Sequence, residues 1–580
     1  MNKKFLRIVI YVAMAVVLVL KLGVIRKLFE LSLWPDMTFY TNLGLQPGVV
    51  LPVLSSILTQ ISGIPILGVA LVLLSLWCLS LIVSKFQKDV ITAIFPAFAA
   101  FWFIVGFDYS LYTFRSQGLL FSQTLGLICA ALMILGWIKI KDYKEAPFYP
   151  LLVALVGYPL FGAYSVVALV AILLDAIVSK KWLPAALAVV CGVCVPLVYS
   201  HFVFTHIDTR YTFLAGLPYM DFVDNHRRFI PLAIAMASLV ILPVIRIKRD
   251  PHVAFTLALT VLMALIIGSF LPYWNRNFHT EIAMQHAIEK NDWNKALKLA
   301  RKADQPSRVI VMYRNIALMN KGRLCDEMFK YPNESVGIDT PAQISQTEVC
   351  GPVVFFYNGL INYSARWSWE MSMMFQRTLE RYKYQAKVAL FTGQENPALV
   401  ERYLDIIGRN LYQRKWVRKY RAMLEDPSLL ESDPEYRVFK ALDNYEEIKY
   451  MSSAVVENTI LQHFMLQEHP EGVMLDASLA ASMTAKDIDM FWYFYDILLA
   501  SGRRIPTHVA EAAILFAYIS RNQSAIDAVA SNLGGPDSPV VRRFIDFSAK
   551  ASAGDEKTCR ERFGDTYWYY IYFVKSITTD

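Results

Sequence analysis

Residues 63–84 read GIPILGVALVLLSLWCLSLIVS, a run of 22 positions without one charged side chain. A helix needs about 20 mostly apolar residues to cross a bilayer, so this run predicts a transmembrane helix. Runs of similar character fill the first half of the chain. They lie at 6–22, 90–106, 119–138, 183–203, 229–245 and 253–273.

A further apolar stretch, 147–179, is too long for one crossing. Gly157, Pro159 and Gly162 interrupt it, which favours two short helices or a re-entrant hairpin. Counting it as two passes gives about nine spans in a helical bundle covering 1–275. Segment 48–60 is too short to span. It is expected either to lie along the interface as an amphipathic helix or to extend the next span.

Charge divides the chain in the same place. Residues 1–275 carry 20 Lys and Arg against 11 Asp and Glu, whereas 276–580 carry 37 against 38. A basic excess confined to loops beside apolar spans is a topology signal, and it excludes nucleic acid as the partner. It predicts a cytoplasmic N-terminus and an extracytoplasmic C-terminal domain, although Lys21, Arg26 and Lys27 fall on the outer side of this map. The expected location is a bacterial inner membrane, with the lipid bilayer as one partner and a periplasmic domain at 276–580.

From about residue 279 apolar residues recur at helical spacing, and no alternating strand pattern persists. Helices are expected at 281–290, 294–302, 308–320 and 372–390, among others. The fold class is therefore all-α, with a helix bundle followed by a soluble helical array. The aromatic stretch 563–573 is interpreted as a capping helix rather than a partner surface.

One unit of this array resembles a tetratricopeptide repeat. In Ala287–Ala303, Trp293 stands at the family's aromatic turn position, and Ala296 and Ala303 stand at its small positions. Asn291 occupies a position where the family prefers glycine, and Asn tolerates a left-handed turn. The resemblance implies a helical solenoid, although the 34-residue period does not carry cleanly through 320–580.

Cysteine and histidine patterns predict little chemistry. Cys325 and Cys350 are disulfide candidates if their domain lies in an oxidising compartment, and two free thiols are the equal alternative. No spacing of histidines and cysteines matches a metal site, and no cofactor is predicted.

Ionisable residues of the first half collect in the loops predicted to be external. Carboxylates at a membrane surface can act as general bases or hold a divalent cation, and arginines can clamp a phosphate. Asp36 and Asp108 are the catalytic candidates on this ground. The substrate-binding candidates are Arg115, His206, Arg227 and Arg228.

This arrangement resembles the C-type superfamily of membrane glycosyltransferases. Asp36 would match the acid in the first external loop that activates the acceptor, Asp108 the second acid, and 48–60 the interfacial helix. The resemblance implies a polyprenyl-linked sugar as donor, and a divalent cation is expected only under this alternative. The paired acids usual in that superfamily are absent.

Two functions are favoured over the others. The first is a membrane-anchored module whose helical array recruits an envelope protein or peptide, because solenoids present extended binding surfaces. The alternative is the lipid-linked sugar transferase, because nine spans exceed what an anchor requires. Transport ranks third, since Asp175 and the break at 157–162 are its only signals. The composition also resembles uncharacterised bacterial envelope proteins, and whether the chain is an enzyme stays open.

Overall fold

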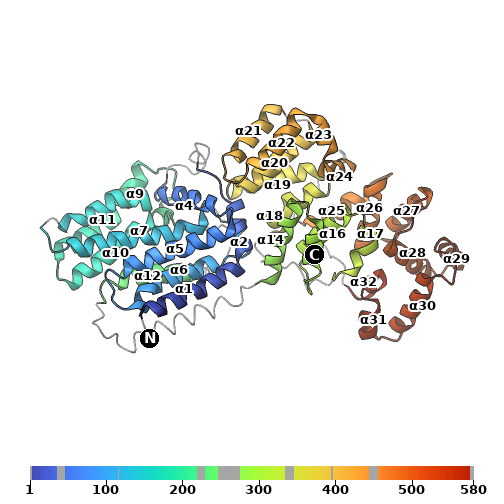
Figure 1. Ribbon diagram of the computed structural model, residues 1–580, viewed down its shortest axis with the longest axis horizontal. Coiled ribbons are helices and arrows are strands. Elements are labelled where there is room, and N and C mark those ends of the chain that lie inside the picture. Colours follow the sequence, from blue (N-terminus) through green and yellow to red (C-terminus); the bar gives the residue numbers. More distant parts are fainter. Residues whose placement is uncertain are drawn as a thin grey trace. The chain divides into compact units, whose positions relative to one another are not determined.

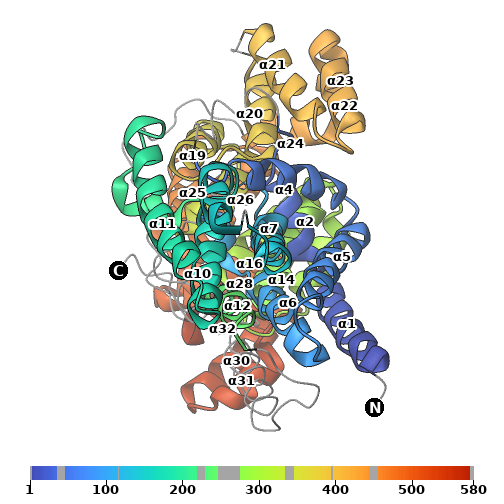
Figure 2. The same ribbon diagram turned by 90° about the vertical axis from the view of Figure 1, so that its left-hand side faces the viewer.

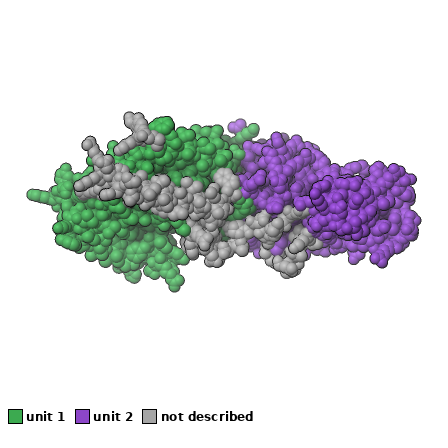
Figure 3. All heavy atoms as spheres, turned by 90° about the horizontal axis from the view of Figure 1, so that it is seen from below, with its two compact units in different colours: residues 1–275, 372–382, 405–417 green, residues 276–371, 383–404, 418–580 purple. Residues whose placement is uncertain are grey.

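A computed structural model describes residues 3–35, 46–114, 117–144, 146–218, 229–245, 275–333, 345–393, 396–442 and 455–574. All regular elements in these ranges are helices, so the all-α prediction is confirmed. The chain forms two compact units (Figure 3). Unit 1 comprises residues 1–275 with the later segments 372–382 and 405–417, and unit 2 comprises 276–371, 383–404 and 418–580. The domain boundary predicted from the sequence, at residue 275, leaves out the two later segments that belong to unit 1.

Unit 1 is a helix bundle. Its long helices run roughly side by side in Figure 1 and are seen closer to end-on in Figure 2. The helices are α1 (Lys3–Leu20), α2 (Leu22–Glu30), α4 (Val50–Ile61), α5 (Pro65–Val83), α6 (Val90–Val105), α7 (Leu119–Ile140), α8 (Tyr149–Leu152), α9 (Tyr158–Phe161), α10 (Ala163–Val178), α11 (Trp182–Phe202) and α12 (Ile230–Ile241).

Three helices of the described chain, α5, α7 and α11, are long and apolar enough to cross a membrane. Helices α1 and α2 qualify together, as a pair bent by 65°. The expectation of about nine spans is therefore wrong for the described residues, where three helices qualify, or four with the bent pair. The predicted span at 253–273 lies outside the described residues.

Helix length and burial explain why the sequence predicts more membrane spans than the described residues contain. Helix α6 has 16 residues and α12 has 12, short of the roughly 20 that a span requires. Most side chains of α6 are buried within unit 1. Hydropathy alone does not distinguish a helix buried in protein from one that faces lipid, so a buried apolar helix was counted as a span.

The predicted break in 147–179 is confirmed. The chain runs through α8, a π-helical turn at Val153–Gly157, and α9, and then stops at Gly162 before α10 begins. Gly162 has φ 57° and ψ −131°, a conformation that residues with a Cβ rarely adopt. The glycine therefore separates the stretch into two short helical segments.

Helix α4 is a separate element and not an extension of the next span, because the chain turns at 62–64 before α5. Its polar side chains Ser55, Ser56, Thr59 and Gln60 are fully buried, whereas Leu54 is 46% exposed. A helix on the surface of a water-soluble protein exposes its polar side chains and buries its apolar ones, whereas α4 does the opposite. It gives unit 1 an apolar exterior at this helix.

Unit 2 is an array of mostly short helices in which most consecutive helices pack against each other. It contains α14 (Arg276–Glu289), α15 (Trp293–Ala300), α16 (Arg308–Asn320), α17 (Leu324–Glu327), α18 (Gln346–Tyr357), α23 (Pro427–Ser432), α24 (Pro434–Leu442), α25 (Val456–Met465), α26 (Gly472–Ala485), α27 (Ile488–Ala500), α28 (Thr507–Ile519), α29 (Gln523–Asn532), α30 (Pro539–Ser552), α31 (Glu556–Phe563) and α32 (Tyr567–Phe573). Four helices carry residues of both units, namely α19 (Ile361–Met374), α20 (Leu379–Thr392), α21 (Pro397–Gly408) and α22 (Arg414–Glu425).

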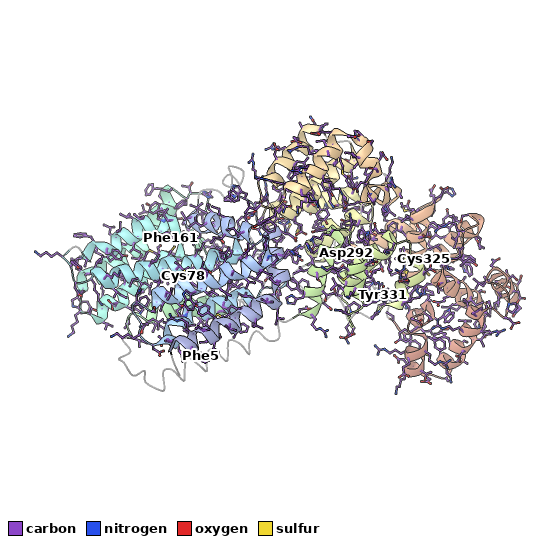
Figure 4. The ribbon with its side chains drawn as sticks, in the orientation of Figure 1. Phe5, Cys78, Phe161, Asp292, Cys325 and Tyr331 are labelled. Atoms are coloured by element: carbon purple, nitrogen blue, oxygen red, sulfur yellow. The ribbon has the colours of Figure 1, made fainter. Side chains whose placement is uncertain are left out.

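The hairpin of α14 and α15 has the local features that its sequence predicts. Asn291 takes a left-handed φ of 57°, and Asp292 caps α15 by accepting a hydrogen bond from the backbone N–H of Lys295 at 3.1 Å (Asp292 is labelled in Figure 4). The Trp293 ring meets Tyr357 edge-on at 6.0 Å. Ala296 is fully buried, so a small side chain is needed where the two helices approach.

Two other expectations for this half have clear outcomes. The helix expected at 372–390 is interrupted, because α19 ends at Met374 and Thr378 caps a new helix through the backbone N–H of Arg381. The aromatic helix α32 packs against α28, where Trp568 Nε1 donates to the Glu511 carbonyl at 2.7 Å. Trp568 is buried, as expected of a closing helix.

Cys325 and Cys350 are both buried as free thiols among the described residues. Cys325 Sγ donates to the carbonyl of Asp476 on α26, and Cys350 Sγ donates to the carbonyl of Gln346 on its own helix (Cys325 is labelled in Figure 4). The two thiols thus have separate acceptors on different elements, and both are free in this structure.

Candidate ligand pocket

Unit 1 contains a cavity of about 730 Å³. This volume falls within the range of small-molecule sites in proteins. Its walls come from the start of α4 and the residues before it, the start of α7, the loop at 207–218 and the first turns of α12. They are lined by Gln46, Pro47, Gly48, Pro52, Gln117, Ser122, Gln123, Ile207, Asp208, Tyr211, Leu214, Ala215, Gly216, Leu217, Pro218, Phe229, Leu232, Ala233 and Met236.

Three glycines join the segments beside this cavity. Gly48, Gly162 and Gly216 come from three separate loops, and all have positive φ. A Cβ on Gly48 would lie 3.1 Å from the Cα of Gly216, and a Cβ on Gly162 would collide with the carbonyl oxygen of Ala215. Backbone hydrogen bonds hold the junction, from Gly48 N to Pro159 O at 3.0 Å and from Ala163 N to Ala215 O at 2.7 Å. The break after Phe161 (labelled in Figure 4) thus allows the backbone of Gly162 to lie directly against the loops that carry the pocket residues.

The start of α7 is fixed against α4. Gly118 adopts φ 64° ahead of α7, and its carbonyl accepts a hydrogen bond from the Ser55 hydroxyl. The same hydroxyl oxygen accepts from the backbone N–H of Phe121 at 3.2 Å. A Cβ on Gly118 would lie 2.7 Å from Ser55, so glycine permits this close approach.

Neutral polar side chains from α7 form one part of the lining. Gln123 is buried, accepts from the hydroxyl of Tyr164 and donates to Ser122 Oγ at 3.0 Å. Gln117 is 8% exposed, and its Nε2 donates to the carbonyl of Arg377 at 2.8 Å. Gln117 Oε1 has no hydrogen-bond partner among the described residues. Because Arg377 belongs to one of the two later segments of unit 1, that segment helps to orient a pocket residue.

Asp208 is the carboxylate of the described lining. It is exposed, and its Oδ1 accepts from the backbone N–H of Arg210 at 2.9 Å, which starts the 3₁₀ turn Thr209–Leu214. Tyr211 follows in the same turn and also lines the cavity. The polar groups of the described lining are amides, hydroxyls and this carboxylate, which can hydrogen-bond to hydroxyl or amide groups of a ligand.

Of the site residues predicted from the sequence, Asp108 and His206 are described, and neither lines this cavity. Asp108 is buried outside the described lining, and its Oδ1 caps the turn at Tyr109–Tyr112 through the Ser110 N–H at 3.0 Å. His206 is exposed in the loop that carries Asp208 but does not line the cavity. Asp36, Arg115, Arg227 and Arg228 lie outside the described residues.

Asp175, the acid that could have signalled transport, has a structural role. Its carboxylate accepts hydrogen bonds from Trp137 Nε1 at 2.9 Å and from Lys141 Nζ at 2.8 Å. Trp137 lies on α7 and Lys141 is the residue directly after it, and all three side chains are buried. The ion pair of Asp175 and Lys141 joins α10 to the end of α7, and none of the three residues lines the pocket.

Fold and cavity together define an all-helical protein with a bundle of apolar helices around a sizeable pocket of mixed polarity. The chain belongs to a family of unknown function, DUF6057, whose model matches residues 9–574. No curated protein and no solved structure matches it.

Proposed function

We propose that this chain is a membrane protein whose unit 1 binds an amphiphilic molecule taken from the bilayer. The observation that carries the proposal is the cavity of about 730 Å³ with two kinds of wall. Amide, hydroxyl and carboxylate groups from α7 and the 207–218 loop suit a polar head. Leu214, Leu217, Phe229, Leu232 and Met236 suit the start of an apolar chain.

The surface of unit 1 supports a membrane setting. Large apolar side chains stand exposed along the helices that qualify as spans, including Leu74 on α5 and Val190 and Val198 on α11. In water such a surface favours association, whereas in a bilayer it matches the solvent. The inward-facing polar side chains of α4 follow the same logic.

A transfer reaction on that amphiphile is the chemical extension of the proposal. The likeness to C-type glycosyltransferases expects a polyprenyl-linked sugar and an acid in the first external loop, Asp36. Asp208 is the described carboxylate within the pocket, so we add it to Asp36 as a candidate general base. Asp108 lies outside the described lining and its Oδ1 caps a turn, so the proposal assigns it no part in the pocket.

Unit 2 supports a second role, as the helical-repeat module that recruits an envelope protein or peptide. The observation in its favour is the hairpin of α14 and α15, with Asn291 in a left-handed turn and Ala296 buried at the crossing. This role is compatible with ligand binding in unit 1, since many membrane enzymes act with partners.

Filling the pocket tests the main proposal. Ala233 and Ala237 are both exposed and lie one turn apart on α12, but only Ala233 lines the cavity. Ala233→Trp should displace bound amphiphile, because the indole occupies the space of the ligand. The measurement is mass spectrometry of the lipids that co-purify with the full chain in mild detergent.

We expect one lipid class to be retained by the parent protein and by Ala237→Trp but to fall about tenfold or more in Ala233→Trp, equivalent to at least about 1.4 kcal/mol. Equal lipid content in all three proteins would rule out a ligand site in this cavity.

A further inference from the structure

We infer that the turn between α21 and α22 docks on anionic lipid headgroups at the surface of the bilayer. The inference rests on the proposed membrane setting of unit 1, and it does not depend on a ligand in the pocket. The four residues that carry it are Leu411 and Tyr412 in the turn and Arg414 and Lys415 at the start of α22, all within the 405–417 segment of unit 1.

The turn is fixed to unit 1 by Asn410. Asn410 Oδ1 accepts hydrogen bonds from the backbone N–H of Trp34 at 2.7 Å and from Gln60 Nε2 at 3.1 Å. Its Nδ2 donates to the carbonyls of Ile406 at 2.9 Å and Ile407 at 3.2 Å. With Asn410 buried and both ends of its amide engaged, the turn is held firmly beside α4.

This attachment places the turn at the end of a candidate span. The Tyr412 ring lies against Gly63, two residues before α5 begins at Pro65, and a Cβ on Gly63 would approach that ring to 2.5 Å. Phe29 on α2 meets the same ring edge-on at 6.4 Å. If α5 crosses the bilayer, Tyr412 lies at the level of the headgroups, where tyrosine and tryptophan are enriched.

The side chains of the turn suit the headgroup level of a bilayer. Leu411 and Tyr412 are exposed, and Arg414 and Lys415 follow at once in the first turn of α22, also exposed. No hydrogen bond or ion pair links either basic side chain to another described residue. Apolar and aromatic side chains beside unpaired basic ones are the combination that binds anionic membrane surfaces.

Tyr412 also holds an unfavourable backbone conformation. Its φ is 64°, in the left-handed region where glycine or asparagine is favoured. The fold accepts this backbone strain at a residue whose side chain is half exposed. A lipid surface uses that ring, because its apolar body and hydroxyl tip suit the interface.

Site-specific photo-crosslinking in the full chain tests the position of the turn. A benzophenone amino acid replaces Tyr412, and a second protein carries it at Tyr518 on α28, which is equally exposed at 53% against 51%. A third carries it at Leu74 on α5 as the membrane reference. The proteins are reconstituted into vesicles of phosphatidylcholine and phosphatidylglycerol, irradiated and analysed for lipid adducts.

Lipid adducts at 412 and 74 but not at 518 are the expected result. Adducts at 74 alone would overturn the docking inference while leaving unit 1 in the membrane. Absence of adducts at both 412 and 74 would overturn the membrane setting as well, and a protein adduct at 412 would assign the turn to a protein partner instead.

A charge variant tests the headgroup chemistry. Arg414→Gln with Lys415→Gln should lower the phosphatidylglycerol retained by the purified full chain about tenfold, since each basic residue near an anionic surface adds severalfold to binding. Lys298→Gln with Lys302→Gln, on the exposed side of the α15 hairpin, removes the same charge and should leave retention unchanged. Equal losses in both variants would show a general charge effect and contradict docking by this turn.

Discussion

His463 on α25 is a histidine kept neutral by its surroundings. It is buried, and its Nε2 has no hydrogen-bond partner among the described residues. Burial lowers the pKa of His463 to about 4, because the charged ring would lose its hydration. Protonation of this ring is therefore coupled to the unfolding of unit 2.

The sign of the pH effect follows from that coupling. Between about pH 6.5 and about pH 4 the unfolded chain binds a proton at this ring and the folded chain does not, so stability falls as the pH falls through this window. The loss should approach about 3 kcal/mol at its acid end. Thermal unfolding of the full chain against pH measures it. His463→Phe should flatten the curve, whereas the same change at the exposed His469 should reproduce the parent curve.

At the level of single residues, sequence patterns identify some roles and miss others. Asp108 lies where the sequence predicts an external loop, and its Oδ1 caps a turn, as aspartate side chains often do in turns. Gln117 and Gln123 carry no sequence signature, because a neutral amide gains its importance only when the fold places it at a cavity. Asp208 lies in a loop whose acidic and basic residues stand out in the sequence. Nothing in the sequence indicates that this loop packs beside α7 and α12.

Among the helices, glycines in the sequence allow some of the breaks to be predicted. The break at 157–162 was predictable because glycine and proline end helices locally. The junction that it makes with Gly48 and Gly216 was not, since contacts between distant loops leave no local trace. The interruption of 372–390 was missed because Thr378 is a cap whose signal lies within a continuous helical periodicity.

Gly162→Ala tests how much the junction depends on this break. Alanine would be strained at φ 57° and ψ −131°, and its Cβ would collide with the carbonyl oxygen of Ala215. We expect a loss of about 3 kcal/mol or more in stability, measured by thermal unfolding in detergent. The control is Gly192→Ala within α11, where the nearest side-chain atom lies at 3.7 Å. That change should leave stability equal or raise it by about 0.5–1 kcal/mol. Similar effects at both positions would show that the Gly162 junction carries no special constraint.

For the whole molecule, the two units interleave along the sequence. Segments 372–382 and 405–417 follow nearly a hundred residues or more of unit 2, yet they belong to unit 1. A boundary drawn where hydropathy changes cannot reveal this, because both segments are polar enough to be assigned with the helical array. The consequence is that a fragment ending at residue 275 lacks parts of its own unit.

The ion pair between Lys27 and Glu380 allows this dependence to be measured in the intact chain. Lys27 Nζ lies 2.5 Å from Glu380 Oε2, and the Lys27 side chain is 1% exposed. Removing the carboxylate leaves a buried ammonium without its partner charge, which typically costs about 3–5 kcal/mol. Glu380→Gln should therefore destabilise unit 1 by that amount. Glu370→Gln removes a carboxylate from the exposed pair with Arg366 on α19 and should cost at most about 0.5 kcal/mol. Unfolding of both variants, followed by a probe on α5, gives the comparison. Equal stability of the two would mean that the Lys27–Glu380 pair does not tie segment 372–382 to the rest of unit 1.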